Sequence, residues 1–271
     1  MDQSASSRPT PPEELFSVAG LKVVVTGGTS GIGRMIAGGF AAGGAHVVVT
    51  SRKPDAVEST VTELSEVARD SSGSVTGTTS DLSSEDGCAA FAEWVQRDHD
   101  SLDVLVNNAG ATWGVPLEEH DSASWDRVLN LSVQGVFHTT KFLLPLLRAA
   151  GTAQRPARVV NIGSINGLEP PILETYSYSA SKAAVHQLTR HLAGQLAPEI
   201  TVNAIAPGAF PSKMMRATLD SFGEEIAAGT PLKRIGRADD MAGIALFLAS
   251  RAGSYLTGAV IPVDGGASTC G

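Results

Sequence analysis

Residues 21–33 read L-K-V-V-V-T-G-G-T-S-G-I-G, a β-branched run that leads directly into a glycine-rich stretch. The run 21–26 leaves no room for a helix and predicts a buried parallel strand. A helical pattern with small residues on one side follows over 34–43. Strand, glycine turn and helix in this order place a pyrophosphate at the N-terminus of the helix.

The glycines of this turn are spaced G-x-x-x-G-x-G, which differs from the G-x-G-x-x-G dinucleotide fingerprint. Gly27 permits the tight turn, Gly31 lets the backbone approach a phosphate, and Gly33 lets the helix pack near the sheet. We therefore expect a dinucleotide phosphate site, the alternative being a glycine-rich loop without a ligand. Its candidate residues are Gly27, Thr29, Ser30, Gly31, Ile32 and Gly33.

The second predicted strand, 46–51, ends in a basic turn. An NAD site usually places Asp or Glu here to bind the ribose 2′-hydroxyl, whereas this chain has Ser51, Arg52 and Lys53. A carboxylate would repel a 2′-phosphate, and an arginine can bind it through two parallel hydrogen bonds. The sequence therefore favours NADP(H) over NAD(H); the alternative is that Arg52 and Lys53 form a solvated surface pair.

Strands and helices alternate through the rest of the chain. Strands are predicted at 75–79, 102–106, 158–162, 200–205 and 260–263, and helices at 54–69, 84–99, 124–150, 176–196 and 238–249, while the apolar stretch 209–230 is predicted to be irregular. Such alternation implies a parallel sheet covered on both faces. We expect one α/β domain over residues 15–271, a Rossmann-type doubly wound parallel sheet of about seven strands, preceded by a flexible tail at 1–14.

Polar and glycine residues gather where the predicted strands end, which is where open α/β sheets bind ligands. Besides the glycine turn, these positions hold Asp81 and Leu82, Asn108, Ala109 and Gly110, Ser164, and Pro207 and Gly208.

The stretch 175–185, T-Y-S-Y-S-A-S-K-A-A-V, places Tyr178 four residues before Lys182. On a helix this spacing puts both side chains on one face, a turn apart. A phenol beside an ammonium can donate and accept a proton, with its pKa pulled down from about 10. Tyr176 cannot replace Tyr178, because the residue four positions after it is Ala180. Such a pair also occurs by chance, so its meaning depends on the rest of the chain.

Composition excludes several classes of protein. The net charge of −8 over 271 residues argues against general nucleic-acid binding. No run of about 18 apolar residues predicts a membrane span, and the N-terminus lacks a secretory signal. Cys88 and Cys270 lack metal or redox spacing and predict reduced thiols in a cytoplasmic protein. His138, His186 and His191 lie on predicted helices without metal-ligand partners, so they are predicted to be structural and no metal site is expected.

Taken together, these motifs resemble those of the short-chain dehydrogenase/reductase superfamily, in its shorter single-domain branch. They occur in the order typical of that family and cover nearly the whole chain from about residue 16. The matching pieces are Thr26-Gly27-x-x-x-Gly31-Ile32-Gly33, Asp81-Leu82, Asn107-Asn108-Ala109-Gly110, Asn130, Ser164, Tyr178-x-x-x-Lys182, Pro207-Gly208 and Asp264-Gly265-Gly266.

The resemblance implies a role for each matching polar residue. Tyr178 would donate a proton to a carbonyl on reduction, or remove one from an alcohol on oxidation. Lys182 would lower the pKa of Tyr178 and hold the nicotinamide ribose. Ser164 would hydrogen-bond the substrate oxygen, and Asn130 would hold a water that links Lys182 to solvent. Ser212 stands at a position that is commonly Thr and would contact the nicotinamide carboxamide.

Two stretches, 50–53 and 203–214, are similar to NADPH-dependent β-ketoacyl reductases of the rhamnolipid-pathway type. This resemblance implies reduction of a ketone or 3-oxoacyl carbonyl, including acyl thioesters. The alternatives are an oxidative polyol or secondary-alcohol dehydrogenase and a catalytically silent NADP-binding regulator. The family also implies a homo-oligomer, dimer or tetramer, built on helices 124–150 and 176–196, and a loop over 209–230 that covers the substrate.

Overall fold

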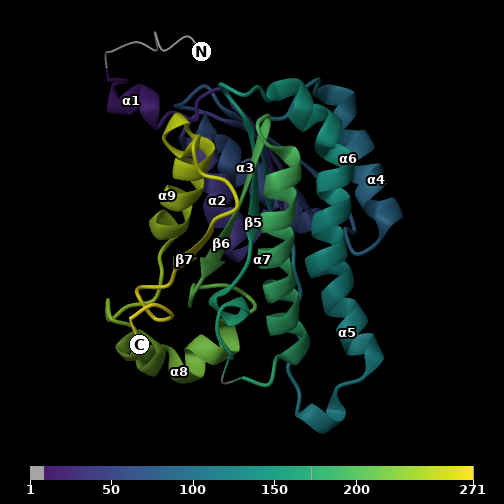
Figure 1. The fold of residues 1–271 in the computed structure, drawn as a ribbon, viewed down its shortest axis with the longest axis vertical. Coiled ribbons are helices and arrows are strands. Elements are labelled where there is room, and N and C mark those ends of the chain that lie inside the picture. The colour runs from purple at the N-terminus through teal and green to yellow at the C-terminus, as the bar shows by residue number, and fades with distance from the viewer. Residues whose placement is uncertain (1–8, 172, 271) are drawn as a thin grey trace.

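Within residues 9–171 and 173–270, which this computed structural model describes, seven parallel strands form one sheet with helices on both faces (Figure 1). The sheet order is β3-β2-β1-β4-β5-β6-β7. The strands are β1 (Lys22–Thr26), β2 (His46–Ser51), β3 (Ser74–Thr79), β4 (Val104–Asn107), β5 (Ala157–Ile162), β6 (Ile200–Pro207) and β7 (Val260–Val263). The predicted fold class, a doubly wound Rossmann-type sheet, is confirmed.

Helices connect successive strands along most of the chain. They are α2 (Gly31–Ala42), α3 (Pro54–Ala68), α4 (Glu85–Asp98), α5 (Ser122–Leu129), α6 (Gly135–Ala150), α7 (Tyr176–Leu196), α8 (Arg216–Gly229) and α9 (Ala238–Ala249). The predicted bounds of 176–196 and 238–249 agree with α7 and α9.

Two predictions about helices are wrong. The helix predicted over 124–150 is interrupted, because a π-helical turn, Asn130–Gln134, separates α5 from α6. At this turn Gly135 packs directly on the carbonyl of Leu82, a contact that a Cβ would block. The stretch 209–230 is also not irregular, because α8 occupies most of it. Helix α8 buries no side chain, although Leu219, Phe222 and Ile226 recur at helical spacing along it, a signal that the prediction of an irregular stretch overlooked.

The N-terminal tail was expected over 1–14, and its residues 1–8 lie outside the described residues. Helix α1 (Pro12–Leu15) begins inside the remainder. Proline at the first helical position and two glutamates in the first turn favour a helix start here. The carboxylate of Glu14 also pairs with Arg251 at 2.6 Å.

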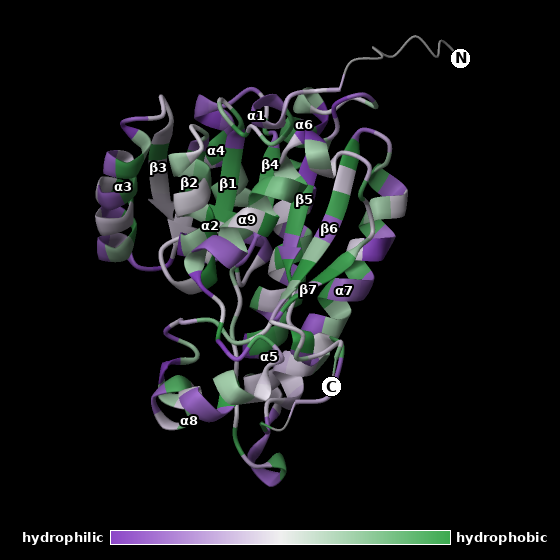
Figure 2. Cartoon of the chain, turned by 90° about the vertical axis from the view of Figure 1, so that its left-hand side faces the viewer, coloured by the Kyte–Doolittle hydropathy of each residue, from purple (hydrophilic) through white to green (hydrophobic). Residues whose placement is uncertain are grey.

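The sheet separates two hydrophobic cores, because successive side chains of a strand point to opposite faces. Val23 and Val25 of β1 lie in one core with α2, α3 and α9. Val24, between them, lies in the other core with α4 and α6. Figure 2 shows the hydrophobic strands at the centre of the molecule, between these helices. Burying one such valine contributes about 1.5–3 kcal/mol relative to exposing it.

The strand order reverses between β1 and β4, which are neighbours although two strands separate them in the chain. Open α/β sheets bind ligands in the crevice at such a switch point, outside the carboxyl ends of the strands. The register pairs Val25 with Val106, and Asn107 with Asn161. The segments that follow β1, β4 and β5 therefore emerge together at one edge of the sheet.

Candidate active site

The glycine turn after β1 lets its backbone lie unusually close to neighbouring segments. Gly27 and Gly31 have φ angles of +63° and +52°, in the left-handed region that favours glycine. A Cβ on Gly33 would collide with the side chain of Asn108, and one on Gly31 would lie 2.9 Å from the Cβ of Ser212. The three glycines therefore bring the turn against β4 on one side and against the segment before α8 on the other.

A hydrogen-bonded clasp joins the ends of β1 and β4. The hydroxyl of Thr26 accepts from the backbone N–H of Asn108 at 2.9 Å and of Ala109 at 3.0 Å. In return, the Asn108 amide donates to the carbonyls of Thr26 and Gly27, at 2.9 and 3.1 Å. Thr26 was not among the predicted site residues, although a hydroxyl as the last residue of an apolar strand was a usable signal.

The N-terminus of α2 faces a cavity of about 700 Å³. Ser30 precedes the helix, and its side chain does not cap the first turn, which leaves backbone N–H groups for an anion. Three basic residues of α2 and the α8 segment, together with acidic ones, line this cavity: Arg34, Lys213, Arg216, Asp55 and Asp220. The sequence had indicated none of these three cations.

The predicted 2′-phosphate residues follow β2 in an exposed turn. The hydroxyl of Ser51 accepts from the N–H of Lys53 at 3.2 Å. Arg52 and Lys53 are exposed and do not line the 700 Å³ cavity. A hydrogen bond from Ser83 lowers the pKa of Asp81, and the nearby charge of Arg52 acts in the same direction. Arg52 therefore stands close to Asp81, at the outer end of the switch-point crevice.

Three predicted catalytic residues meet where the segment after β5 lies against the first turns of α7. Ser164 lies two residues after the end of β5 and precedes the 3-10 turn Ile165–Gly167, with its hydroxyl accepting from the N–H of Asn166 at 3.2 Å. Lys182 is only 5% exposed, and its Nζ donates to the carbonyl of Ile162 at 2.8 Å. The same Nζ lies 5.5 Å from the centre of the Tyr178 ring.

Burial dominates the electrostatics of this cluster. It raises the pKa of Tyr178, with a hydrogen bond to Ser164 acting in the opposite direction. It lowers the pKa of Lys182 from 10.5 to about 8. The expectation that Lys182 pulls the phenol pKa below 10 is therefore wrong for the chain by itself. The ammonium lies over the ring and bonds the Ile162 carbonyl, and desolvation disfavours the phenolate.

Asn130 begins the π-helical turn, and its side-chain oxygen accepts from the amide of Gln134 at 3.0 Å. The hydroxyl of Ser132 in the same turn accepts from the N–H of Ala111 at 3.1 Å. Next to Ala111, a Cβ built on Gly110 would lie 3.6 Å from Nζ of Lys182. The π-helical turn, the segment after β4 and Lys182 are therefore neighbours, and the water-binding role of Asn130 stays a prediction.

A buried polar relay fixes the strands and helices behind these residues. Asn107 donates to Thr140 of α6 at 3.0 Å and to Asn161 of β5 at 2.9 Å. Asn161 donates in turn to Thr189 of α7, also at 2.9 Å. Buried hydrogen bonds of this kind favour one arrangement of the elements that they join, although Oδ1 of Asn107 has no partner among the described residues. The relay thus fixes α7, which carries Tyr178, against the sheet.

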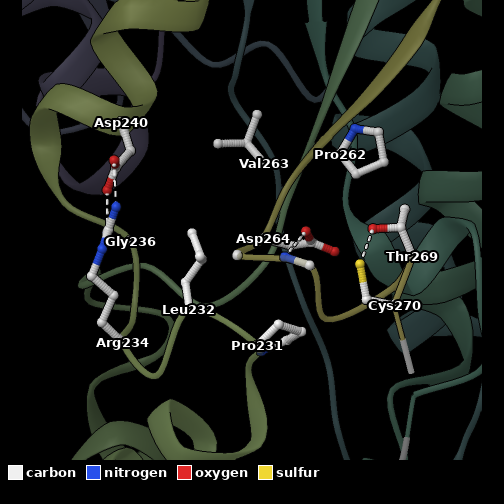
Figure 3. Close-up of a pocket in the computed structure, with 12 residues that line it drawn as sticks. Pro231, Leu232, Arg234, Gly236, Asp240, Pro262, Val263, Asp264, Thr269 and Cys270 are labelled. Carbon is white, nitrogen blue, oxygen red and sulfur yellow. Dashed lines mark hydrogen bonds and ion pairs between the residues drawn. The ribbon is translucent and has the colours of Figure 1, made fainter.

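Pro207 and Gly208 end β6 beside the C-terminal segment. The N–H of Gly208 donates to the carbonyl of Val263 at 3.0 Å, and a Cβ on Gly208 would lie 2.7 Å from that of Asp264. A second cavity, of about 490 Å³, opens next to Asp264 (Figure 3). Arg234 and Asp240 form a two-point ion pair at its wall, at 2.6 and 2.9 Å. None of the predicted site residues lines this cavity.

The described residues offer neither a metal-ligand cluster nor a membrane-spanning helix. They contain no group of three or more His, Cys, Asp or Glu side chains that could hold a metal ion. Among their helices, none is long and apolar enough to cross a membrane.

Comparison with known proteins decides the family. A family model described as enoyl-(acyl carrier protein) reductase matches residues 27–268. The chain belongs to the short-chain dehydrogenase/reductase superfamily. This confirms the resemblance inferred from the motifs, and the chain is an oxidoreductase of that superfamily.

Individual members of the short-chain dehydrogenase/reductase superfamily align over nearly the full chain. The rhamnolipids biosynthesis 3-oxoacyl-[acyl-carrier-protein] reductase of Pseudomonas aeruginosa is 45% identical over 254 residues, covering 93% of this chain and 97% of that protein. The galactitol 2-dehydrogenase (L-tagatose-forming) of Cereibacter sphaeroides is 36% identical over 258 residues, covering 93% and 96%. The solved RhlG/NADP active-site complex of P. aeruginosa matches with a TM-score of 0.89 and 43% identity, covering 94% and 99%.

Proposed function

We propose that this short-chain dehydrogenase/reductase uses NADPH to reduce a ketone of the 3-oxoacyl class to the corresponding alcohol. The observation that carries the proposal is the meeting of Ser164, Tyr178 and Lys182 at the carboxyl edge of the sheet, next to Gly110. The 45% identical relative is a 3-oxoacyl-[acyl-carrier-protein] reductase, which supports an acyl thioester as substrate.

The residues present fit NADP(H). The uncapped first turn of α2 and its three close-approach glycines suit a pyrophosphate, and the turn after β2 offers Arg52 and Lys53 without a carboxylate. The related P. aeruginosa structure is an NADP complex. The crevice residues that would hold the cofactor are Gly27, Thr29, Ser30, Gly31, Ile32, Gly33, Ser51, Arg52, Lys53, Asp81, Leu82, Asn108, Ala109, Gly110, Tyr178, Lys182, Pro207, Gly208 and Ser212.

When bound, NADPH supplies a hydride for the carbonyl carbon. Tyr178 retains its proton at neutral pH because burial raises the pKa of its phenol, and it donates that proton to the carbonyl oxygen. The Ser164 hydroxyl hydrogen-bonds the same oxygen and stabilises the negative charge that develops there. Lys182, with a pKa of about 8, is mostly charged at pH 7 and stabilises the phenolate that remains. Asn130 would hold the water through which Lys182 exchanges protons with solvent.

Replacing Tyr178 by Phe tests this assignment, because it removes the donated proton and keeps the ring. We expect turnover of a 3-oxoacyl thioester to fall by about 10²–10³-fold or more, the range found when one transition-state hydrogen bond is lost. The affinity for NADPH, measured by fluorescence titration, should change little. Tyr176→Phe is the matched control, since Tyr176 starts the same helix but is partly exposed. Turnover near the wild-type level in Tyr178→Phe would refute the assignment.

Oxidation of a polyol or secondary alcohol is the second candidate, because the galactitol 2-dehydrogenase is 36% identical. A substrate panel separates the two functions: 3-oxoacyl thioesters and ketones with NADPH, against polyols with NADP⁺. Higher kcat/KM for a polyol would replace the proposed reduction. A silent regulator would turn over none of them, and the complete Ser164, Tyr178 and Lys182 set argues against it.

We also propose that the protein acts as a homo-oligomer, a tetramer or a dimer, in the cytoplasm. The resemblance to the family supports this assembly, and helix α6, on which it would be built, presents Phe137 with 41% of its surface exposed. Cys88 and Cys270 are free thiols, which suits a reducing compartment. Light scattering after size-exclusion chromatography measures the mass directly, and a monomer would refute the assembly.

A further inference from the structure

His186 lies buried directly behind the catalytic cluster, on the same helix as Tyr178 and Lys182. It follows Lys182 by four residues, one helical turn, and only 2% of its surface is exposed. Neither ring nitrogen makes a well-formed hydrogen bond among the described residues, although a backbone group of Gly167 lies close enough to influence the ring's pKa. A buried polar ring without a well-formed hydrogen bond is costly and calls for a reason other than solvation.

The imidazole touches the chain on both sides of Ser164. A Cβ on Gly163 would collide with its Nε2, and a Cβ on Gly167 would lie 2.9 Å from its Cε1. The same hypothetical Cβ on Gly167 would lie 2.7 Å from the N–H nitrogen of Ala183. The backbone around Ser164 therefore rests on the ring, at a distance that only glycine allows.

We propose that His186 is a positioning residue: its ring supports the turn Gly163–Gly167 from below and so sets where the Ser164 hydroxyl lies relative to Tyr178. This inference rests on the proposed function, since it assumes that Ser164 and Tyr178 act on one substrate oxygen. Gly167 packs on the backbone of α7 at Lys182 and Ala183, whereas Gly163 packs on the ring, so the ring's thickness determines the separation of turn and helix at the Gly163 end. A smaller side chain at 186 lets the turn sink toward α7, and a bulkier one lifts it.

The surroundings keep this support uncharged. Burial lowers the pKa of His186, a backbone hydrogen bond with Gly167 acts against it, and the charges of Lys182 and Arg190, one turn away on either side, act with it. A neutral ring adds no second positive charge beside Lys182, so its effect on the site is steric.

A double-mutant cycle tests the coupling. In the wild-type background, His186→Ala should lower kcat by about 10- to 100-fold, the range expected when a catalytic group is displaced by about 1 Å. In a Ser164→Ala background, the same substitution should cost less than about threefold, because no hydroxyl remains to be misplaced. If the fold-reduction in kcat of the double variant equals the product of the two single reductions, the proposal is overturned.

Val185→Ala is the matched control, because Val185 is fully buried on the same helix and its truncation also leaves a cavity. It should lower the melting temperature while kcat stays within about twofold. The NADPH dissociation constant, from fluorescence titration, should stay within about twofold in both variants. Equal losses of kcat in His186→Ala and Val185→Ala would mean that His186 is merely structural.

His186→Gln keeps the cycle usable if His186→Ala does not fold. Its flat amide fills much of the ring's place, so it should restore at least part of the lost kcat. If only His186→Gln folds, equal fold-losses of kcat from His186→Gln in the wild-type and Ser164→Ala backgrounds would overturn the proposal. If both variants fold, a kcat of His186→Gln no higher than that of His186→Ala would contradict the steric support. Failure of the proposed function itself would appear differently, as activity retained in Tyr178→Phe.

Discussion

The charge on Lys182 serves the proposed chemistry, but its burial destabilises the folded protein. Its ammonium is nearly fully buried, with one hydrogen bond to the Ile162 carbonyl. The gap between its ordinary pKa of 10.5 and its value of about 8 corresponds to about 3 kcal/mol of preference for the neutral amine. The folded chain therefore carries a charge at neutral pH that destabilises it.

Replacing Lys182 by Met should abolish turnover and still stabilise the cofactor-free protein at pH 7. The charge cost disappears, and the lost hydrogen bond to Ile162 offsets only about 1 kcal/mol of that gain. A net gain of about 2 kcal/mol corresponds to a melting temperature several degrees higher. Thermal unfolding at pH 7 measures it, and a lower melting temperature than wild type would contradict the account.

The pH dependence of this difference has a definite sign. Below pH 8 both folded and unfolded chains hold the proton on Lys182, so the full cost of the buried charge is present. Between about pH 8 and 10.5 the unfolded chain binds more protons, so the wild-type protein gains stability as pH rises. The gap in melting temperature between Lys182→Met and wild type should therefore shrink from pH 8 to pH 10.

At the scale of elements, the hydrogen-bonded clasp between β1 and β4 should contribute to both protein stability and NADPH affinity. Thr26→Val keeps the shape of the side chain but leaves the N–H groups of Asn108 and Ala109 without their acceptor. We expect a loss of about 1–3 kcal/mol of stability and weaker NADPH binding, because the two edges of the crevice lose their link. Chemical denaturation and fluorescence titration measure these effects.

Thr50→Val is the matched control for this clasp. Thr50 pairs with Thr26 in the sheet register and is equally buried, but its hydroxyl has no hydrogen-bond partner among the described residues. Removing it should leave stability unchanged or higher, with NADPH affinity intact. Equal effects of the two substitutions would show that the clasp has no special role.

For the whole molecule, cofactor binding is linked to global unfolding, because a ligand that binds only the folded state stabilises it by mass action. NADPH should therefore raise the melting temperature of the wild-type protein more than NADH does at equal concentration. In Arg52→Ala this difference should largely vanish, since the cation that favours the 2′-phosphate is gone. Arg148→Ala, an exposed substitution on α6, should preserve it. An unchanged preference in Arg52→Ala would refute the 2′-phosphate assignment.

Much of the sheet could be predicted from the sequence because its strands are buried on both faces. Runs such as 46–51 are rich in β-branched residues and too short for a helix, so a buried strand is the assignment that fits them. Helix α7 was predicted with correct bounds, since its 21 residues form a long helical pattern that ends just before Pro198. Ser164, Tyr178 and Lys182 could be grouped from the sequence. Ser164 stands at the end of a predicted strand, and the four-residue spacing of Tyr178 and Lys182 puts them on one face of a predicted helix.

Other features depend on contacts that no local pattern encodes. The π-helical turn at Asn130 accompanies the packing of Gly135 on Leu82, two residues that are distant in the chain. The pKa values of Tyr178 and Lys182 follow from how deeply the fold buries them, which spacing does not reveal. The histidine beneath Ser164 was predicted to be structural for the same reason, because Gly163 and Gly167 reach it only in the folded chain.

Helix α8 lies beyond the carboxyl end of the sheet in Figure 1 and contributes no buried side chain to either core. Substitutions along it therefore carry little thermodynamic penalty, since surface changes usually alter stability by less than about 0.5 kcal/mol. Mutations can accumulate there without unfolding the scaffold, so this segment can drift and acquire new preferences faster than the rest of the enzyme. A laboratory-evolution library concentrated on 216–229 should accordingly yield a high proportion of folded variants with altered selectivity.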